Sequence, residues 1–349
     1  MIRLTWLQFR VQAVTTAAAL AAFAVLLAAT GPHMASLYAA SGLSSCHGGN
    51  CQNLAGSFEA QLQSTAIYPA LYLISVVSIL LAPAVIGLFW GAPLIARELE
   101  TGTSALAWNQ SVTRTRWLAV KLTAVGLTAM AVTEGLSLMQ AWWAAPLGRA
   151  VTHGAPAGAL YQGRFTQLIF ASHGITPLGY AAFAFALGVT AGALIRRTIP
   201  AMAVTLAVFA ALQIAMPLWI RPHFAPADRT VISVALGNDA GGPTGAGGNT
   251  LTLVATSLPG QFGAWILSSG PVNAAGRPVS TTPAACTASS IESSPDFDGC
   301  LTSQGIREAI TYQPASRYWP FQWTETGIYL ALALAMAGYC FRRLNHRRS

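Results

Sequence analysis

Six long apolar runs constrain the fold of this chain more than any other feature. They cover residues 11–30, 67–91, 118–143, 166–194, 199–220 and 324–341. A membrane-spanning helix needs about 20 consecutive apolar residues, and each run approaches or exceeds that length. Charged residues make up only 9% of the chain, against about 25% in a typical soluble domain. The sequence therefore predicts an all-α polytopic membrane protein with six transmembrane helices in a lipid bilayer.

The distribution of Lys and Arg predicts the orientation of these helices, because basic residues are retained on the cytoplasmic side. With the N-terminus inside, 12 of the 19 basic residues fall in short cytoplasmic loops or tails, whereas the first outer loop, 32–65, has none. The twelve are Arg3, Arg10, Arg97, Arg114, Arg116, Lys121, Arg196, Arg197, Arg342, Arg343, Arg347 and Arg348. We therefore expect cytoplasmic termini in a plasma-membrane protein. The net charge of +8 then reflects orientation and predicts no nucleic-acid partner.

The predicted organisation has three parts. These are residues 1–220, with an interface segment, spans one to five and a cytoplasmic loop at 92–117; residues 221–323, a large extracytoplasmic loop; and residues 324–349, with span six and a basic tail. Before the first span, Ile2, Trp6 and Phe9 share a helical face, which fits either a separate interfacial helix or the start of the span itself. In the outer loop, 250–254 alternates like a short strand, and Gly, Pro, Ser and Thr predict loops over 268–295.

The cysteines agree with this topology. Four of them fall in the two outer segments: Cys46, Cys51, Cys286 and Cys300. Four outward cysteines in an oxidising compartment indicate two disulfides, for which three pairings exist. We predict the local pairs Cys46–Cys51 and Cys286–Cys300, because short loops close easily. The spacing of Cys46, His47 and Cys51 matches no common zinc pattern, so we predict no metal site.

Motifs for catalysis are absent from the sequence. It contains no GxxxxGK[ST], no GxSxG, no HExxH and no paired carboxylates at helical spacing within a run. We therefore expect neither an enzyme nor a bound cofactor. Two ionisable residues, Glu134 and His173, lie within apolar runs, where such groups face a polar cavity, pair with each other or are solvated at the membrane interface. All three interpretations stay open.

Small residues and aromatic residues mark two further features. Ala184, Gly188 and Gly192 recur at four-residue intervals, which favours close helix packing, either within the chain or between two subunits of a dimer. An aromatic cluster ends the outer segment, at Tyr312, Tyr318, Trp319, Phe321 and Trp323. Such a cluster is typical of a membrane interface, and the alternative is a lid over a substrate site.

The charge-dense segment between spans two and three carries the candidate functional residues. It contains acidic and basic residues, a Gly-Thr turn and an apolar patch: Arg97, Glu98, Glu100, Gly102, Thr103, Leu106, Trp108, Arg114 and Arg116. The positive-inside rule explains the arginines but not the two glutamates or the patch. An apolar patch in a charged cytoplasmic loop is typical of a surface that docks to a soluble partner.

This segment also carries a resemblance. The stretches RELETGT (97–103) and SVTRTRW (111–117), together with the six-span layout, resemble the permease subunits of ABC type-2 exporters. Two further stretches, 179–206 and 312–334, are similar to an actinobacterial group of these permeases.

The resemblance implies a transmembrane subunit that moves a drug, antibiotic, lipid or peptide outward. It also implies a separate ABC ATP-binding subunit that docks on residues 97–116, and a permease dimer. Two other classes remain as alternatives, a secondary transporter and a membrane-anchored sensor. The first needs ion-coupling carboxylates near the midplane, and the second does not need six spans.

Overall fold

Helices form most of the protein. The computed structural model describes residues 2–46, 51–100, 114–152, 163–234, 242–244, 250–255, 258, 261, 263–286 and 295–346. Its α-helices are α1 (Ile2–Ala40), α2 (Cys51–Gln63), α3 (Ile67–Ile86), α4 (Ala92–Glu100), α6 (Arg114–Trp143), α7 (Ala145–Thr152), α8 (Gln167–Ser172), α9 (Thr176–Ile195), α10 (Thr198–Ala215), α11 (Pro295–Ser303) and α12 (Tyr318–His346). Two π-helical turns, η2 (Gly87–Gly91) and η3 (Met216–Ile220), continue α3 and α10. Short 3-10 turns are η1 (Leu43–Ser45), η4 (Arg221–His223), η6 (Ala284–Cys286) and η7 (Ala315–Arg317).

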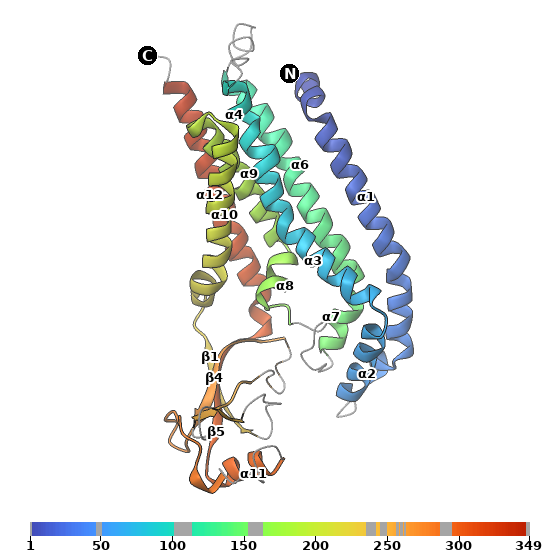
Figure 1. The fold of residues 1–349 in the computed structure, drawn as a ribbon, viewed down its shortest axis with the longest axis vertical. Helices are drawn as coiled ribbons and strands as arrows, with labels where there is room; N and C mark the ends of the chain where they lie inside the picture. Colours follow the sequence, from blue (N-terminus) through green and yellow to red (C-terminus); the bar gives the residue numbers. More distant parts are fainter. Residues whose placement is uncertain are drawn as a thin grey trace.

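Among the residues that the structure describes, six helical segments are long and apolar enough to cross a membrane. They are Arg10–Ala40, Ile67–Arg97, Leu118–Trp143, Thr176–Ile195, Thr198–His223 and Ala315–Arg343. The prediction of six helices with the length and composition of membrane spans is therefore confirmed. Figure 1 shows the start of α1 and the end of α12 at the same end of the bundle as α4.

The structure decides one open boundary and corrects another. Of the two alternatives for the N-terminal segment, the start of the first span is the one observed, because α1 runs unbroken from Ile2 to Ala40. The fourth span is shorter than 166–194, because a turn separates α8 from α9. Gly174 in this turn has a positive φ of 71°, which favours glycine. The side chain of Gln322 accepts hydrogen bonds from the amides of Ile175 and Thr176 at 3.0 and 3.1 Å, so a residue distant in sequence stabilises the break.

Helix α9 is the centre of the bundle. It contacts α3, α4, α6, α10 and α12, and most of its residues are buried. Its sequence is rich in Ala and Gly, and small side chains let several helices approach one axis. The other spans present apolar side chains outward, including Leu73, Leu81 and Leu334, which are 62%, 56% and 72% exposed. So much exposed apolar surface fits contact with lipid.

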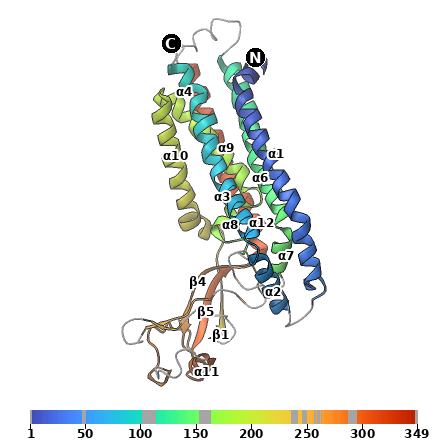
Figure 2. The ribbon, with the colours of Figure 1, turned by 45° about the vertical axis from the view of Figure 1, so that its right-hand side comes forward.

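A small β subdomain lies at the opposite end of the bundle from α4 (Figures 1 and 2). Its three-stranded antiparallel sheet has the order β1-β5-β4, with β1 at Asp228–Ser233, β5 at Arg307–Gln313 and β4 at Trp265–Val272. Asp228 pairs with Tyr312, and Trp265 pairs with Gln313. A second pair joins β2 (Gly242–Thr244) to β3 (Thr250–Thr252).

The sheet corrects two predictions. The all-α fold class holds for the spans but not for the segment between spans five and six. The strand predicted at 250–254 is present at 250–252. The loop predicted over 268–295 is wrong for 268–272, where β4 continues to Val272, and residues 273–283 lie in no helix or strand. The Ser and Gly residues of β4 have low strand propensity, so the sequence did not predict this strand. Pairing with β5, rather than intrinsic propensity, holds it in place.

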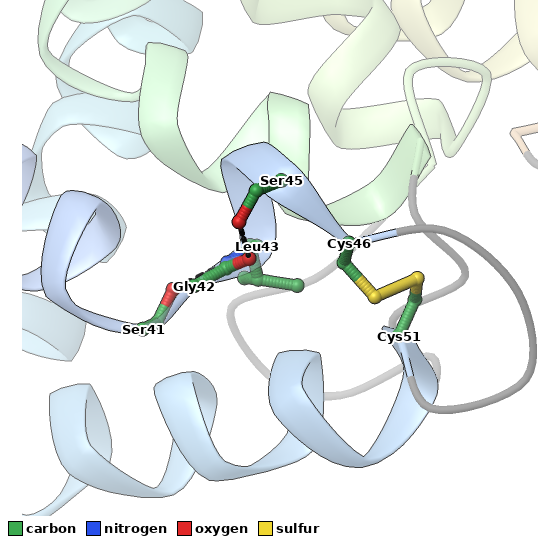
Figure 3. The surroundings of a disulfide bond; sticks show 6 residues. All are labelled: Ser41, Gly42, Leu43, Ser45, Cys46 and Cys51. Atoms are coloured by element: carbon green, nitrogen blue, oxygen red, sulfur yellow. Dashed lines mark hydrogen bonds between the residues drawn. A yellow bond between two sulfur atoms is a disulfide. The ribbon is translucent and has the colours of Figure 1, made fainter.

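Both predicted disulfides are present. The Cα atoms are 5.7 Å apart in Cys46–Cys51 and 5.8 Å apart in Cys286–Cys300. Figure 3 shows the first bridge joining the end of η1 to the start of α2. Since Cys46 and Cys51 are bonded to each other, neither thiolate is available as a zinc ligand. The second bridge lies in the core of the β subdomain with Leu251, Phe297 and Leu301.

Candidate functional site

The candidate residues for coupling to an ATP-binding subunit, in the segment 97–116, begin on α4. Arg97 and Glu100 are exposed on this helix, at the end of the bundle opposite the β subdomain (Figure 1). The carboxylate Oε2 of Glu100 accepts hydrogen bonds from the hydroxyl and the amide of Thr198, at 2.8 and 3.3 Å. These bonds lower the pKa of Glu100, so its charged form is favoured. The acidic end of α4 is thereby connected to the first turn of α10.

The other candidates of this segment are only partly described. Glu98 lies within α4 and Arg114 begins α6, whereas Arg116 is exposed on the first turn of α6. Four candidates lie outside the described residues: Gly102, Thr103, Leu106 and Trp108.

The stripe of small residues on α9 packs against the chain that leads into α4. A Cβ atom added at Gly188 would lie 2.3 Å from the carbonyl oxygen of Gly87, and one at Gly192 would lie 2.5 Å from that of Ala92. On the facing segment, a Cβ atom at Gly87 would lie 2.7 Å from the carbonyl oxygen of Ala184. The two backbones therefore touch, and they touch within one chain.

The contact includes the π-helical turn η2. A π turn inserts one extra residue into a helix and is found frequently at functional sites. Gly91 lies at the end of η2, and a Cβ atom added there would lie 2.7 Å from the carbonyl oxygen of Phe185. The junction of α3 and α4 is thus held directly against the central helix.

No hydrogen bond joins Glu134 to His173 among the described contacts of the two side chains. Oε2 of Glu134 is buried and has no hydrogen-bond partner within the described residues. Nδ1 of His173 lies 3.0 Å from the hydroxyl of Ser172 and 3.1 Å from the carbonyl oxygen of Ile169. Burial lowers the pKa of His173 to about 4, so the imidazole is neutral at pH 7. His173 lines a cavity of about 370 Å³, and Glu134 is not part of that lining.

The aromatic cluster divides into two groups. Tyr318 and Phe321 are buried and pack edge-on against Phe165 at 5.7 and 5.6 Å between ring centroids. Trp319 and Trp323 are 52% and 66% exposed on the same helix. Phe165 also stacks on Trp265 of β4 at 6.0 Å between ring centroids, so the first group connects the helices to the β subdomain. The exposure of the second group agrees with the predicted place at a membrane interface.

Sequence reasoning missed a buried ion pair between spans five and six. Nε and Nη2 of Arg221 donate to the two carboxylate oxygens of Glu325 at 2.7 and 2.9 Å, with the side chains only 1% and 0% exposed. The hydroxyl of Tyr180 on α9 also donates to Glu325, and the Phe170 ring lies 4.0 Å from the guanidinium. The available signal was Glu325 itself, a carboxylate within an apolar run.

Comparison with known proteins identifies one family. No curated protein and no solved structure matches the chain. A family model described as "ABC-2 membrane transporter related" matches residues 17–221, which is more than half of the sequence. The matched range covers most of the first span, all of spans two to four and all but the end of span five, together with the α4 segment and the stripe on α9. The chain therefore belongs to the ABC-2 membrane transporter related family, whose members are multi-pass membrane subunits of ABC transporters.

Proposed function

We propose that this chain is the permease subunit of an ATP-driven exporter in the plasma membrane. In this proposal, a separate ABC ATP-binding subunit docks on residues 97–116, and two permease subunits form the translocation unit. Membership of the ABC-2 family and the exposed charged end of α4 support the proposal.

The backbone contact between α9 and the α3–α4 junction is the observation that carries this function. A force applied to α4 reaches α9 without passing through flexible side chains, because Gly188 and Gly192 leave no space between the backbones. Thr198 at the start of α10 donates hydrogen bonds to Glu100 at the end of α4, so a movement of α4 is also transmitted to α10. Movement of the docked ATPase would therefore move α4, α9 and α10 together.

Two observations support cytoplasmic placement of this end. The exposed residues Arg97, Arg116 and Arg197 lie at this end, on α4, at the start of α6 and directly before α10, in agreement with the positive-inside rule. Both disulfides lie at the other end of the bundle, and disulfides persist in oxidising compartments outside the cytoplasm. An exporter with this orientation receives energy from cytoplasmic ATP at α4 and releases its substrate at the β subdomain.

A double substitution, Glu100→Lys with Leu106→Asp, tests the coupling proposal. It reverses a charge at the end of α4 and places a carboxylate in the apolar patch of the loop. We expect the amount of co-purified ATP-binding subunit and the transport-stimulated ATPase activity to fall at least about tenfold, the equivalent of losing 1.4 kcal/mol of binding energy.

The matched control makes the same two types of change at the opposite end, with Asp298→Lys and Val254→Asp. Val254 is 54% exposed, and Asp298 lies on α11. This control should keep the partner and its activity. If the coupling variant also keeps both, residues 97–116 are not the docking element.

A further inference from the structure

The cavity of about 370 Å³ lies where the helix bundle meets the β subdomain, a region that the coupling mechanism does not use. Its wall combines the end of α6, helix α7, the α8–α9 turn and the start of α12. The volume lies within the range of about 300–1,000 Å³ that is usual for small-molecule sites.

Two arginines supply the charge of this cavity. Arg149 and Arg164 line it, and among the described lining residues there is no carboxylate. The guanidinium of Arg164 lies 3.9 Å from the Cβ position of Gly148, so it reaches across to α7. Its positive charge also contributes to the low pKa of His173. The imidazole is therefore a neutral group that can donate or accept a hydrogen bond beside a cationic one.

The position of Arg149 is fixed by packing. Its guanidinium carbon lies 4.8 Å from the centroid of the Tyr38 ring, a cation–π contact with α1. Its Nε also donates to the carbonyl oxygen of Ala145 at 3.4 Å. These two contacts hold the guanidinium of Arg149 in the wall of the cavity.

The remaining wall is apolar and reaches the lipid-facing surface. Leu138, Ala141, Val151 and Ile169 line it together with the ring of Trp319. Leu138 is 61% exposed and Trp319 is 52% exposed, so this wall continues onto the outside of the helices. A chain that leaves the cavity on this side would lie along apolar surface.

We propose that this cavity binds an amphiphile with an anionic head group, held by Arg149 and Arg164, with its alkyl chain along Leu138 and Trp319. Guanidinium groups bind phosphate and carboxylate oxygens through paired charge-assisted hydrogen bonds. A phospholipid of the bilayer and a soluble anionic amphiphile share this chemistry. The site does not depend on the exporter assignment, because it is formed within one chain.

Photo-crosslinking with a dodecyl phosphate that carries a diazirine in its chain tests the proposal. The full-length protein is placed in phosphatidylcholine nanodiscs, and labelled peptides are mapped by mass spectrometry. We expect labels within 137–151 and at 318–319, and competition by unlabelled dodecyl phosphate. Substituting Arg149→Gln and Arg164→Gln together should reduce labelling at least about tenfold, since each hydrogen bond to a charged group is worth more than a neutral one.

Two further variants keep the test interpretable. Arg277→Gln removes an exposed arginine from the far end of the β subdomain and should leave labelling unchanged. Ala141→Trp fills the apolar wall while both arginines remain, and it should reduce labelling even if the double glutamine variant does not fold. Nanodiscs that contain phosphatidylglycerol identify the source: suppression of labelling indicates a bilayer lipid, and unchanged labelling indicates a soluble amphiphile.

Three results would overturn the site. The first is equal labelling of these regions in the double glutamine variant. The second is equal labelling by a trimethylammonium probe with the same chain, because the arginines would then play no part. The third is full competition by inorganic phosphate at the concentration at which dodecyl phosphate competes, because the alkyl chain would then contribute nothing.

Discussion

At the scale of single residues, the ion pair between Arg221 and Glu325 explains how three spans are fixed to one another. Arg221 ends span five, Glu325 lies in span six, and Tyr180 of α9 donates a hydrogen bond to the same carboxylate. Nη1 of Arg221 is buried with no hydrogen-bond partner among the described residues, so Glu325 provides its charge compensation. Removing the carboxylate would leave a buried charge uncompensated.

We therefore expect Glu325→Ala to lower the free energy of unfolding by about 3–5 kcal/mol, the usual effect of breaking a buried pair. The double variant Arg221→Met, Glu325→Leu should recover at least half of this loss, because no unpaired charge remains. Thermal and denaturant unfolding of the purified protein measure both effects.

The partly exposed pair of Arg317 and Asp228, at 3.0 Å, provides the control. Asp228→Asn should cost no more than about 1 kcal/mol, because solvent screens this pair. Equal losses for Glu325→Ala and Asp228→Asn would show that the buried pair has no special role.

At the scale of elements, the packing of α9 against η2 and α4 depends on glycines at defined positions. Gly188 faces backbone atoms of Gly87, Gly91 and Ala92, which cannot move aside as a side chain can. By contrast, a Cβ atom added at Gly135 on α6 would meet nothing within 4 Å. The same substitution should therefore have opposite effects at the two positions.

Gly188→Ala should destabilise the protein by about 1–3 kcal/mol, because an added methyl group forces the two backbones apart. Gly135→Ala should stabilise it by about 0.5–1 kcal/mol, because alanine loses less conformational freedom in a helix. Unfolding midpoints of the two variants in the same detergent measure the difference. Equal shifts would contradict the close approach of α9 and η2.

At the scale of the whole molecule, the structure separates two ends with different chemistry. One end carries α4, the start of α1 and the end of α12, and the other carries the β subdomain, α2 and both disulfides (Figures 1 and 2). The proposed orientation places the first end in the cytoplasm and the second outside the membrane.

Cysteine labelling in intact cells tests this orientation. In a Cys340→Ser background, a cysteine at Ala275, an exposed residue that follows β4, should react with a membrane-impermeant maleimide. A cysteine at Asn345, near the end of α12, should react only after the cells are permeabilised. Reaction at Asn345 in intact cells would reverse the proposed orientation.

The features that the sequence by itself determined are those that depend on neighbouring residues. Six spans follow from apolar runs of about 20 residues. The two disulfides also follow, because their cysteines are only 5 and 14 residues apart. The segment at 97–116 could be selected for the same reason, since its charges and turn residues lie within one short stretch.

The tertiary structure decided the features that join distant parts of the chain. Arg221 and Glu325 are 104 residues apart, and Gln322 binds the α8–α9 turn from 147 residues away. The strand order β1-β5-β4 and the lining of the 370 Å³ cavity also bring together segments that are far apart in the sequence. Periodicity specifies which face of a helix is apolar, but it does not specify which helix covers that face. That choice depends on how all six spans pack together, because most buried polar groups find their partners only in the completed bundle.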